Sequence, residues 1–325
     1  FCAGENHKES LRTVRKLGDN NIFSVLDYSV EGGSKEESFE KFLSKKIETI
    51  DFSNKNKYMP FVVFKPSCFG RSLLFMKLSN GDVLLDKEKD EWGKVKNRFE
   101  SIISRAINSK IKIMVDAEES WTQKIIDYLM EHLMKKYNKK EAWVFTTLQM
   151  YRKDRLSYLE KLIRKCKKEN FKLGIKLVRG AYLEAENLRA QKMNYTSPIC
   201  VNKSETDKNF DAAISIILKN LKNILLFTGT HNEKSINNII YWMRQNKIPK
   251  NHPNIWFAQL FGMGDHITFN LAKRKFHAVK YIPFGPFQEV LPYLIRRAEE
   301  NSSVDSNSKR ELELINTEIK RRRVN

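Results

Sequence analysis

The stretch from Leu173 to Tyr182, LGIKLVRGAY, places two cations in and beside an apolar run. Its aliphatic and β-branched residues predict a buried strand that ends before Gly180, where backbone or ligand can approach closely. A lysine in a central strand is costly to bury unless it meets an anion. Lys176 and Arg179 therefore either face an anion or lie in water at a frayed sheet edge, and the apolar neighbours favour the first alternative.

Polar side chains also stand at or just after the ends of other predicted strands. If the strands are parallel, their carboxyl ends meet on one face, which is where barrel folds carry their active sites. Cations outnumber anions in this set, so the predicted pocket suits an anionic substrate, an anionic cofactor or both. The set comprises Lys65, Asp116, Gln149, Lys176, Arg179, Thr230, His231, Gln259 and Tyr281 and, one helix later, Arg296 and Arg297.

Arg296 and Arg297 form a doublet near the end of a predicted helix. Adjacent helix residues point about 100° apart, yet both side chains can reach one small ligand at the helix edge. A guanidinium pairs with a carboxylate through two parallel hydrogen bonds. The alternative is a pair of exposed surface arginines, and the spacing alone leaves both open.

His231 has no second histidine or acidic residue at ligand spacing, so we expect no metal there. A hydrogen bond to a cofactor is favoured over general-base work. The run from Asp116 to Glu119, DAEE, can hold a divalent ion or pair with the cations of the pocket, and the second suits so basic a site. The four cysteines show no CxxC spacing, so neither zinc nor a disulfide framework is indicated.

The elements that must position these residues alternate strand and helix along the chain. A doubly wound sheet is the alternative to a (β/α)8 barrel, but neither GxGxxG nor a P-loop appears. We therefore predict an α/β fold, a distorted (β/α)8 TIM-type barrel over residues 1–304, followed by a charged C-terminal tail over 305–325. The predicted strands are Phe23–Tyr28, Phe61–Lys65, Ile111–Val115, Ala142–Thr147, Leu173–Val178, Ile224–Phe227, Ile255–Ala258 and His277–Tyr281.

The composition of the 325 residues, with 41% hydrophobic and 11% aromatic residues, excludes a disordered chain. The formal net charge of +20 has two interpretations: a surface for nucleic acid or anionic lipid, or lysines scattered over solvated helix faces. The only tight basic run is Lys320 to Arg323, so we favour the second and expect no nucleic-acid partner.

Several motifs in this order resemble the proline dehydrogenase family, from about Phe23 to Val304. LPYLIRRAEEN at 291–301 is the most specific of them, and the likeness is greatest to the monofunctional bacterial and mitochondrial type. The other motifs are VDAEES at 115–120, TLQMY at 147–151, IKLVRGAY at 175–182, GTHN at 229–232, FAQLFGMGDH at 257–266 and KYIPFG at 280–285.

The resemblance implies a barrel that holds FAD and oxidises L-proline to Δ1-pyrroline-5-carboxylate. A hydride would pass from proline C5 to flavin N5, and a membrane quinone would then take the electrons. This is the first step of proline catabolism. The alternative is a hydroxyproline dehydrogenase of the same fold, which we disfavour because such relatives are expected to carry a smaller residue than Tyr281.

The same resemblance assigns roles to individual residues. Asp116 and Lys176 form the catalytic group, in which Asp116 orients the charged cluster, and Glu300 holds an arginine. Lys65, Tyr182, Tyr281, Arg296 and Arg297 would bind proline. Ala117, Gln149, Arg179, Gly180, Ala181, Thr230 and His231 would hold FAD, together with Lys176.

Two departures from the family accompany these assignments. Position 176 is Lys where many members carry Arg, which keeps the charge but not the two-bond fork. The helical arm that usually precedes the barrel has no counterpart here, so we expect the numbered chain to be incomplete. The resemblance places the protein in a bacterial cytoplasm, with peripheral contact at an anionic inner membrane, or alternatively on the matrix side of the mitochondrial inner membrane.

Overall fold

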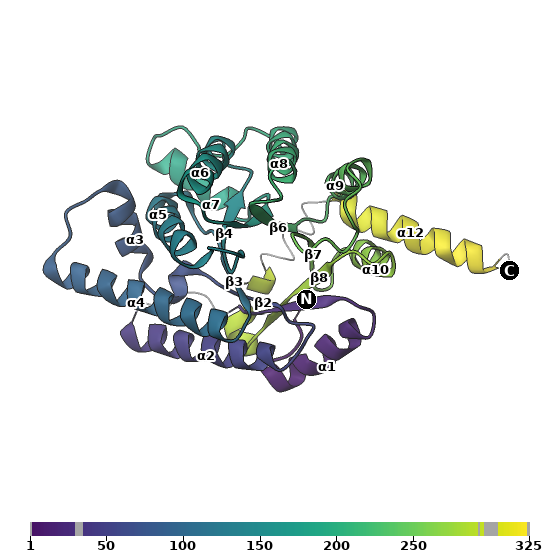
Figure 1. Cartoon of the computed structure of the whole chain (residues 1–325), viewed down its shortest axis with the longest axis horizontal. Coiled ribbons are helices and arrows are strands. Elements are labelled where there is room, and N and C mark those ends of the chain that lie inside the picture. The colour runs from purple at the N-terminus through teal and green to yellow at the C-terminus, as the bar shows by residue number, and fades with distance from the viewer. Residues whose placement is uncertain (1, 30–34, 292, 296–304, 324–325) are drawn as a thin grey trace.

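The computed structural model describes residues 2–29, 35–291, 293–295 and 305–323. Within these residues, eight parallel strands form one sheet that curls into a nearly closed barrel with helices around it (Figure 1). The predicted barrel is therefore confirmed. The strands are β1 (Phe23–Tyr28), β2 (Phe61–Phe64), β3 (Lys112–Val115), β4 (Val144–Gln149), β5 (Leu173–Val178), β6 (Ile224–Gly229), β7 (Ile255–Leu260) and β8 (Ala278–Phe284).

The strand order β1-β8-β7-β6-β5-β4-β3-β2 runs around the barrel without a reversal. A doubly wound sheet needs a point where the order reverses, so this alternative is excluded. No ladder joins β1 to β2 in the described part of the chain. A hydrogen bond from Ser24 N to Tyr58 O (2.8 Å) and an ion pair between Lys65 and Asp27 (3.3 Å) bridge this seam.

Helices cover the outside of the sheet, and two short ones, α3 and α7, add to the predicted alternation of strand and helix. Neither is long enough to show a clear apolar periodicity in the sequence. The described helices are α1 (His7–Gly18), α2 (Glu36–Asn54), α3 (Ser72–Asn80), α4 (Asp86–Asn108), α5 (Ser120–Tyr137), α6 (Arg155–Glu169), α7 (Leu183–Lys192), α8 (Lys203–Leu218), α9 (Glu233–Gln245), α10 (Asp265–Lys273) and α12 (Asp305–Arg323), with the 3₁₀ turn η1 at Pro66–Cys68.

Strands β4, β6, β7 and β8 continue beyond their predicted ends, to Gln149, Gly229, Leu260 and Phe284. The added residues include polar ones, which hydropathy assigns to loops. Register with a neighbouring strand keeps them in the sheet: Thr228 pairs with Phe257, and Gln259 pairs with Lys280. Strand ends of this kind are set by ladder bonds and not by apolar pattern.

Aromatic rings from alternate strand positions fill the barrel interior toward the amino ends of the strands. The ring of Phe61 packs against those of Phe145 (5.7 Å between centroids), Phe227 (5.1 Å) and Trp256 (4.9 Å), and Phe23 packs against Trp256 (5.0 Å). Among the described residues, this layer fills the barrel at the amino ends of the strands.

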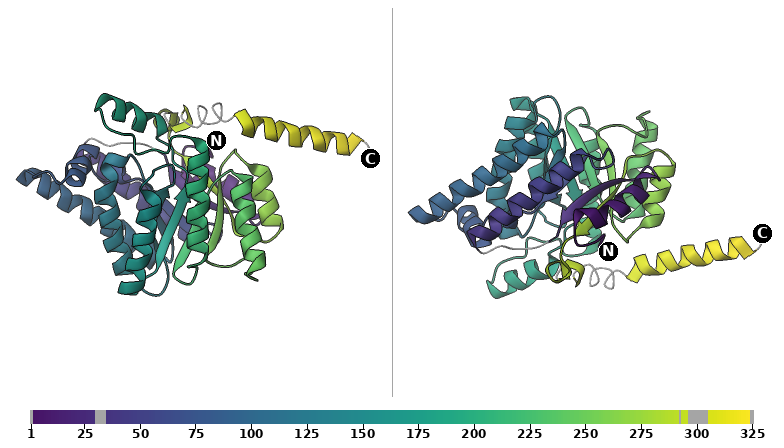
Figure 2. Two further views of the ribbon diagram at one scale, coloured as in Figure 1. Left: turned by 90° about the horizontal axis from the view of Figure 1, so that it is seen from above. Right: turned by 90° about the horizontal axis from the view of Figure 1, so that it is seen from below.

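Helix α12 extends away from the barrel in all three views (Figures 1 and 2). It carries the predicted charged tail, and its side chains from 312 to 322 are mostly exposed. No helix in the described ranges has an apolar stretch long enough to cross a bilayer.

Candidate active site

The side-chain alternation that fills the barrel floor also turns polar residues inward at the strand ends. Val25, Val63 and Met114 belong to the interior core, so the residues two positions later face the same way. Those residues are Asp27, Lys65 and Asp116, and Lys176 and Tyr281 join them from β5 and β8. Together with Lys46 of α2 these six residues form what we call the strand-end cluster: Asp27, Lys46, Lys65, Asp116, Lys176 and Tyr281.

Asp116 is the centre of this cluster. Its carboxylate accepts a 2.5 Å hydrogen bond from Lys176 Nζ and a 3.1 Å bond from the Tyr281 hydroxyl, and Lys65 Nζ lies 3.7 Å away. Lys176 Nζ also lies 4.6 Å from the centroid of the Tyr281 ring. Burial and the neighbouring Asp116 carboxylate raise the pKa of Tyr281 well above 10, so its hydroxyl stays a donor. Four predicted site residues are thus in direct contact.

Asp27 is the second anion of the cluster, and the sequence analysis did not single it out. It is 1% exposed and pairs with Lys46 (3.2 Å) and Lys65 (3.3 Å). Burial alone would raise the pKa of Asp27, but the two ammonium groups outweigh it and hold the pKa well below 3.8. The available signal was a carboxylate inside the apolar run FSVLDY, the same kind of anomaly as Lys176.

Lys46 was also missed. It stands on the face of α2 that carries Phe39, Phe42 and Ile50, and its side chain is 2% exposed. A lysine on a buried helix face needs a buried anion, and Asp27 supplies it.

The charges of the strand-end cluster do not cancel. Three lysines face two carboxylates among its members, in a barrel filled by aromatic rings toward the amino ends of its strands. A surplus positive charge with little water around it attracts a small anion strongly. Lys65 Nζ lies 5.9 Å from the ring of Tyr293, which brings the segment at 293–295 over this site. The predicted ligands Arg296 and Arg297, and Glu300, lie outside the described residues.

A second group of predicted residues gathers at the ends of β5 and β6. The Arg179 guanidinium donates to Asp207 (2.6 Å), to the Thr230 hydroxyl (2.7 Å) and to Ser235 (3.0 Å). It also stacks 4.2 Å from the Phe210 ring. Arg179 is therefore held rigidly by α8 and α9, with two of its five N–H groups left over from these bonds. Arg179 thus fixes the position of the loop at Thr230 and also provides a positive charge at the strand ends.

Gly180 has φ +134°, a backbone conformation that side chains rarely adopt. A Cβ built there would lie 2.4–2.6 Å from the Tyr151 ring, so the close approach inferred from the sequence is that of a protein ring. Ala181 follows, and Tyr182 is the N-cap residue of α7, both partly exposed. The turn thus leaves these two predicted residues accessible.

His231 follows β6 and packs against the loop after β7. The backbone N–H of Leu260 donates to His231 Nε2 over 3.5 Å. Gly264, with φ +60°, packs so closely that a Cβ would lie 3.0 Å from His231 Nδ1. The ring position is thereby set by backbone of the β7 loop.

Gln149 and Ala117 test whether the site fits a flavin. Gln149 is 3% exposed at the inward-facing end of β4, and its amide nitrogen donates to Ala117 O at 3.4 Å. Its amide oxygen is buried and has no hydrogen-bond partner among the described residues. A buried orphan acceptor calls for a donor. One edge of an isoalloxazine ring carries N–H donors for an amide oxygen and C=O acceptors for an amide nitrogen. The residues present therefore fit FAD.

The acidic residues of the run 116–119, after β3, have different partners. Asp116 pairs with lysines, and Glu118 accepts hydrogen bonds from the Ser67 backbone (2.8 Å) and hydroxyl (2.5 Å). No group of three metal-ligating side chains comes together in the described ranges. Burial raises the pKa of Glu118 from 4.5 to about 7, and neighbouring Glu119 adds to the rise.

We expect a Glu118→Gln variant to gain stability over the parent protein as the pH rises from 4.5 to 7. Across that range the unfolded chain has lost its Glu118 proton while the folded chain keeps it, so the parent loses stability with rising pH. The advantage of the variant should level off at about 3 kcal/mol above pH 7. Urea unfolding of both proteins at several pH values measures it, and a difference independent of pH would contradict the assignment.

Eight parallel strands around a cationic cluster at their carboxyl ends define a (β/α)8 barrel. The cluster lies on the face where such barrels carry their active sites. The chain belongs to the proline dehydrogenase family, whose model, described as "Proline dehydrogenase", matches residues 10–310. The resemblance inferred from the motifs is confirmed.

Three known proteins show how far the similarity extends. The chain is 35% identical to "Carbapenem antibiotics biosynthesis protein CarD" of Pectobacterium carotovorum subsp. carotovorum, over 100% of this chain and 84% of CarD. It is 34% identical to "Proline dehydrogenase 1, mitochondrial" of Dictyostelium discoideum, over 99% of this chain and 64% of that protein. Proline utilization A (PutA) from Bdellovibrio bacteriovorus, solved after inactivation by N-propargylglycine, shares the fold with a TM-score of 0.81 at 20% identity, over 94% of this chain and 33% of PutA.

Proposed function

We propose that this protein oxidises L-proline to Δ1-pyrroline-5-carboxylate with FAD as its cofactor, as the first step of proline catabolism. One observation carries the proposal within the family: Lys65, Asp116, Lys176 and Tyr281 meet in one contact network at the strand ends. Proline is a small molecule with one carboxylate and one apolar ring. A cationic cluster lined by an aromatic face complements both parts.

The residues of the chain divide the work of holding proline. Lys65, with Arg296 and Arg297, would bind the carboxylate. Tyr281 and Tyr182 would wall the ring and exclude water. Asp116 holds Lys176 and Tyr281 in place and spaces the cations, which would otherwise repel one another. The catalytic contribution of these groups is orientation at a fixed distance.

FAD, when bound, would supply the acceptor for the hydride that leaves proline C5, and a membrane quinone would take the electrons from it. Gln149, Ala117, Lys176 and Arg179 would hold the cofactor, together with Gly180, Ala181, Thr230 and His231. A cation such as Lys176 favours negative charge developing beside it. Peripheral contact with an anionic membrane, where a quinone resides, is compatible with the net charge of +20.

The purified protein should be yellow after loading with FAD, and its visible absorbance should bleach when L-proline is added without oxygen. 4-Hydroxyproline should be oxidised more slowly than proline. The Tyr281 hydroxyl is hydrogen-bonded to Asp116, and the Tyr281 ring occupies the space beside Lys176. Spectra and kcat/KM values for both substrates make the test. A protein that takes up no FAD, or that keeps its full absorbance with both substrates, would refute the proposal.

A further inference from the structure

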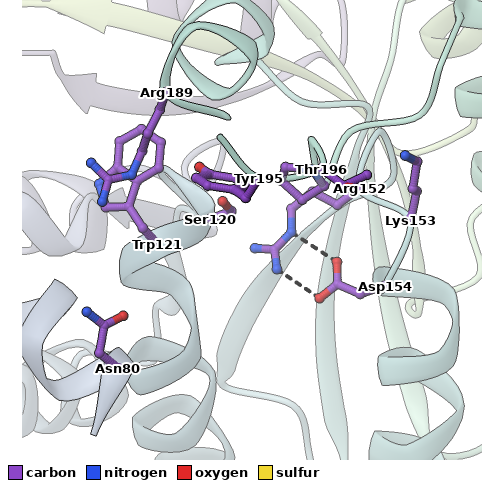
Figure 3. Close-up of a pocket in the computed structure, with 10 residues that line it drawn as sticks. Asn80, Ser120, Trp121, Arg152, Lys153, Asp154, Arg189, Tyr195 and Thr196 are labelled. Carbon is purple, nitrogen blue, oxygen red and sulfur yellow. Dashed lines mark hydrogen bonds and ion pairs between the residues drawn. The ribbon is translucent and has the colours of Figure 1, made fainter. Parts of the chain in front are cut away.

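A pocket of about 420 Å³ lies outside the strand-end cluster (Figure 3). It is formed by the end of α3, the start of α5, the loop after β4, α7 and the segment that follows α7. None of its lining residues belongs to that cluster. Its volume is within the range of small-ligand sites. The residues that carry the argument are Ser120, Trp121, Arg152, Asp154, Arg189 and Tyr195.

Arg152 is the buried cation of this pocket, at 7% exposure. Its Nε and Nη2 donate to the two carboxylate oxygens of Asp154 (3.0 and 2.8 Å). Its Nη1 is buried and has no hydrogen-bond partner among the described residues. In Figure 3 this third nitrogen points away from Asp154, toward the side where Ser120 and Trp121 lie. A buried, charged donor without an acceptor is costly, so an oxygen anion is the missing partner.

The opposite wall combines a cation with flat apolar faces. The Arg189 guanidinium lies 4.6 Å from the Trp121 ring, and its Nη2 donates a hydrogen bond to the weak acceptor Met76 Sδ (3.3 Å). Tyr195 adds a second ring, 41% exposed. Three cations, counting Lys153, line the pocket against the single carboxylate of Asp154. Charge and shape therefore favour an anion that carries a flat ring.

The wall formed by residues 195–200 is held in place by the loop after β4. Ile199 and Arg152 form an antiparallel bridge, Lys153 N donates to Pro198 O (2.9 Å), and Cys200 N donates to Tyr151 O (2.7 Å). A wall tied by backbone bonds needs little ordering when a ligand enters.

We propose that this pocket is a second ligand site, which binds a small planar molecule bearing a carboxylate or phosphate. The anionic group would lie on Arg152 Nη1 and Arg189, and the ring would pack on Trp121 and Tyr195. The site is separate from the one that holds proline and does not depend on the proposed oxidation.

Isothermal titration calorimetry of the FAD-loaded protein tests this site with three probes: AMP, anthranilate and the uncharged adenosine. AMP or anthranilate should bind, and the one that binds identifies the anionic group, while adenosine should not. Arg152→Met should weaken binding at least about tenfold through loss of a charged hydrogen bond, and Arg189→Met should do the same without disturbing the Asp154 pair.

Lys192→Met is the matched control, because it removes an exposed cation from the same helix α7 outside the pocket. It should leave the affinity unchanged. The proposal is overturned if neither anion binds, if all three variants keep the parent affinity, or if binding appears only in protein without FAD, since the pocket would then be part of the cofactor site. Proline turnover is measured separately, so failure of this site leaves the proposed function standing.

Discussion

The kcat/KM of an Asp116→Asn variant for L-proline should be lower than that of the parent by at least about a hundredfold. We expect no larger effect from any other single substitution that keeps the size of a side chain and removes its charge. The carboxylate holds Lys176 at 2.5 Å and the Tyr281 hydroxyl at 3.1 Å, and it lies 3.7 Å from Lys65. An amide keeps the size but removes the charge that balances two lysines. Those side chains then separate, and groups from β2, β5 and β8 lose their common position.

Steady-state kinetics of the FAD-loaded variant measures this loss, and thermal unfolding shows whether the fold survives. Asp86→Asn is the matched control, because Asp86 pairs with Lys89 on the surface of α4 and its side chain is 95% exposed. It should change kcat/KM by less than about twofold, as exposed pairs contribute little. Equal activities of the Asp116 and Asp86 variants would show that the cluster does not organise the site.

An Asp27→Asn variant should lower the free energy of unfolding by about 3–5 kcal/mol at neutral pH, because breaking a buried ion pair leaves a buried charge behind. Lys46, 2% exposed, loses the carboxylate 3.2 Å away. The double variant Asp27→Asn/Lys46→Met should recover at least about 1 kcal/mol of that loss, because it removes the stranded ammonium as well. Urea unfolding of the parent, both single variants and the double variant gives the coupling energy.

The contribution of Asp27 should depend on pH with a definite sign. Its folded pKa lies below the ordinary 3.8, so the stabilisation is present above pH 3.8 and is lost as the pH falls toward the folded pKa. The difference between parent and Asp27→Asn should therefore shrink in acid below 3.8. Strictly additive single and double variants, with no coupling between positions 27 and 46, would contradict this account of the pair.

The missed residues show what kind of signal the sequence holds. Asp27 and Lys46 are charged residues in apolar patterns, as Lys176 is, but each becomes interpretable only with its partner in view. Their contact joins β1 to α2 across 19 residues of chain. The pocket beside α7 shows the same limit, because it exists only where the loop after β4 meets the segment at 195–200.

By itself, the sequence determined the strand–helix alternation, the barrel class and the placement of Lys65, Asp116, Lys176 and Tyr281 in or next to strands, because hydrophobic periodicity is a local property of each segment. Only the tertiary structure decided that Asp116 is the common partner of Lys65, Lys176 and Tyr281. It also decided that Asp27 and Lys46 complete the cluster and that β1 pairs with β8. These facts depend on barrel closure and register, which bring together residues far apart in the chain and leave no periodic trace within any one segment.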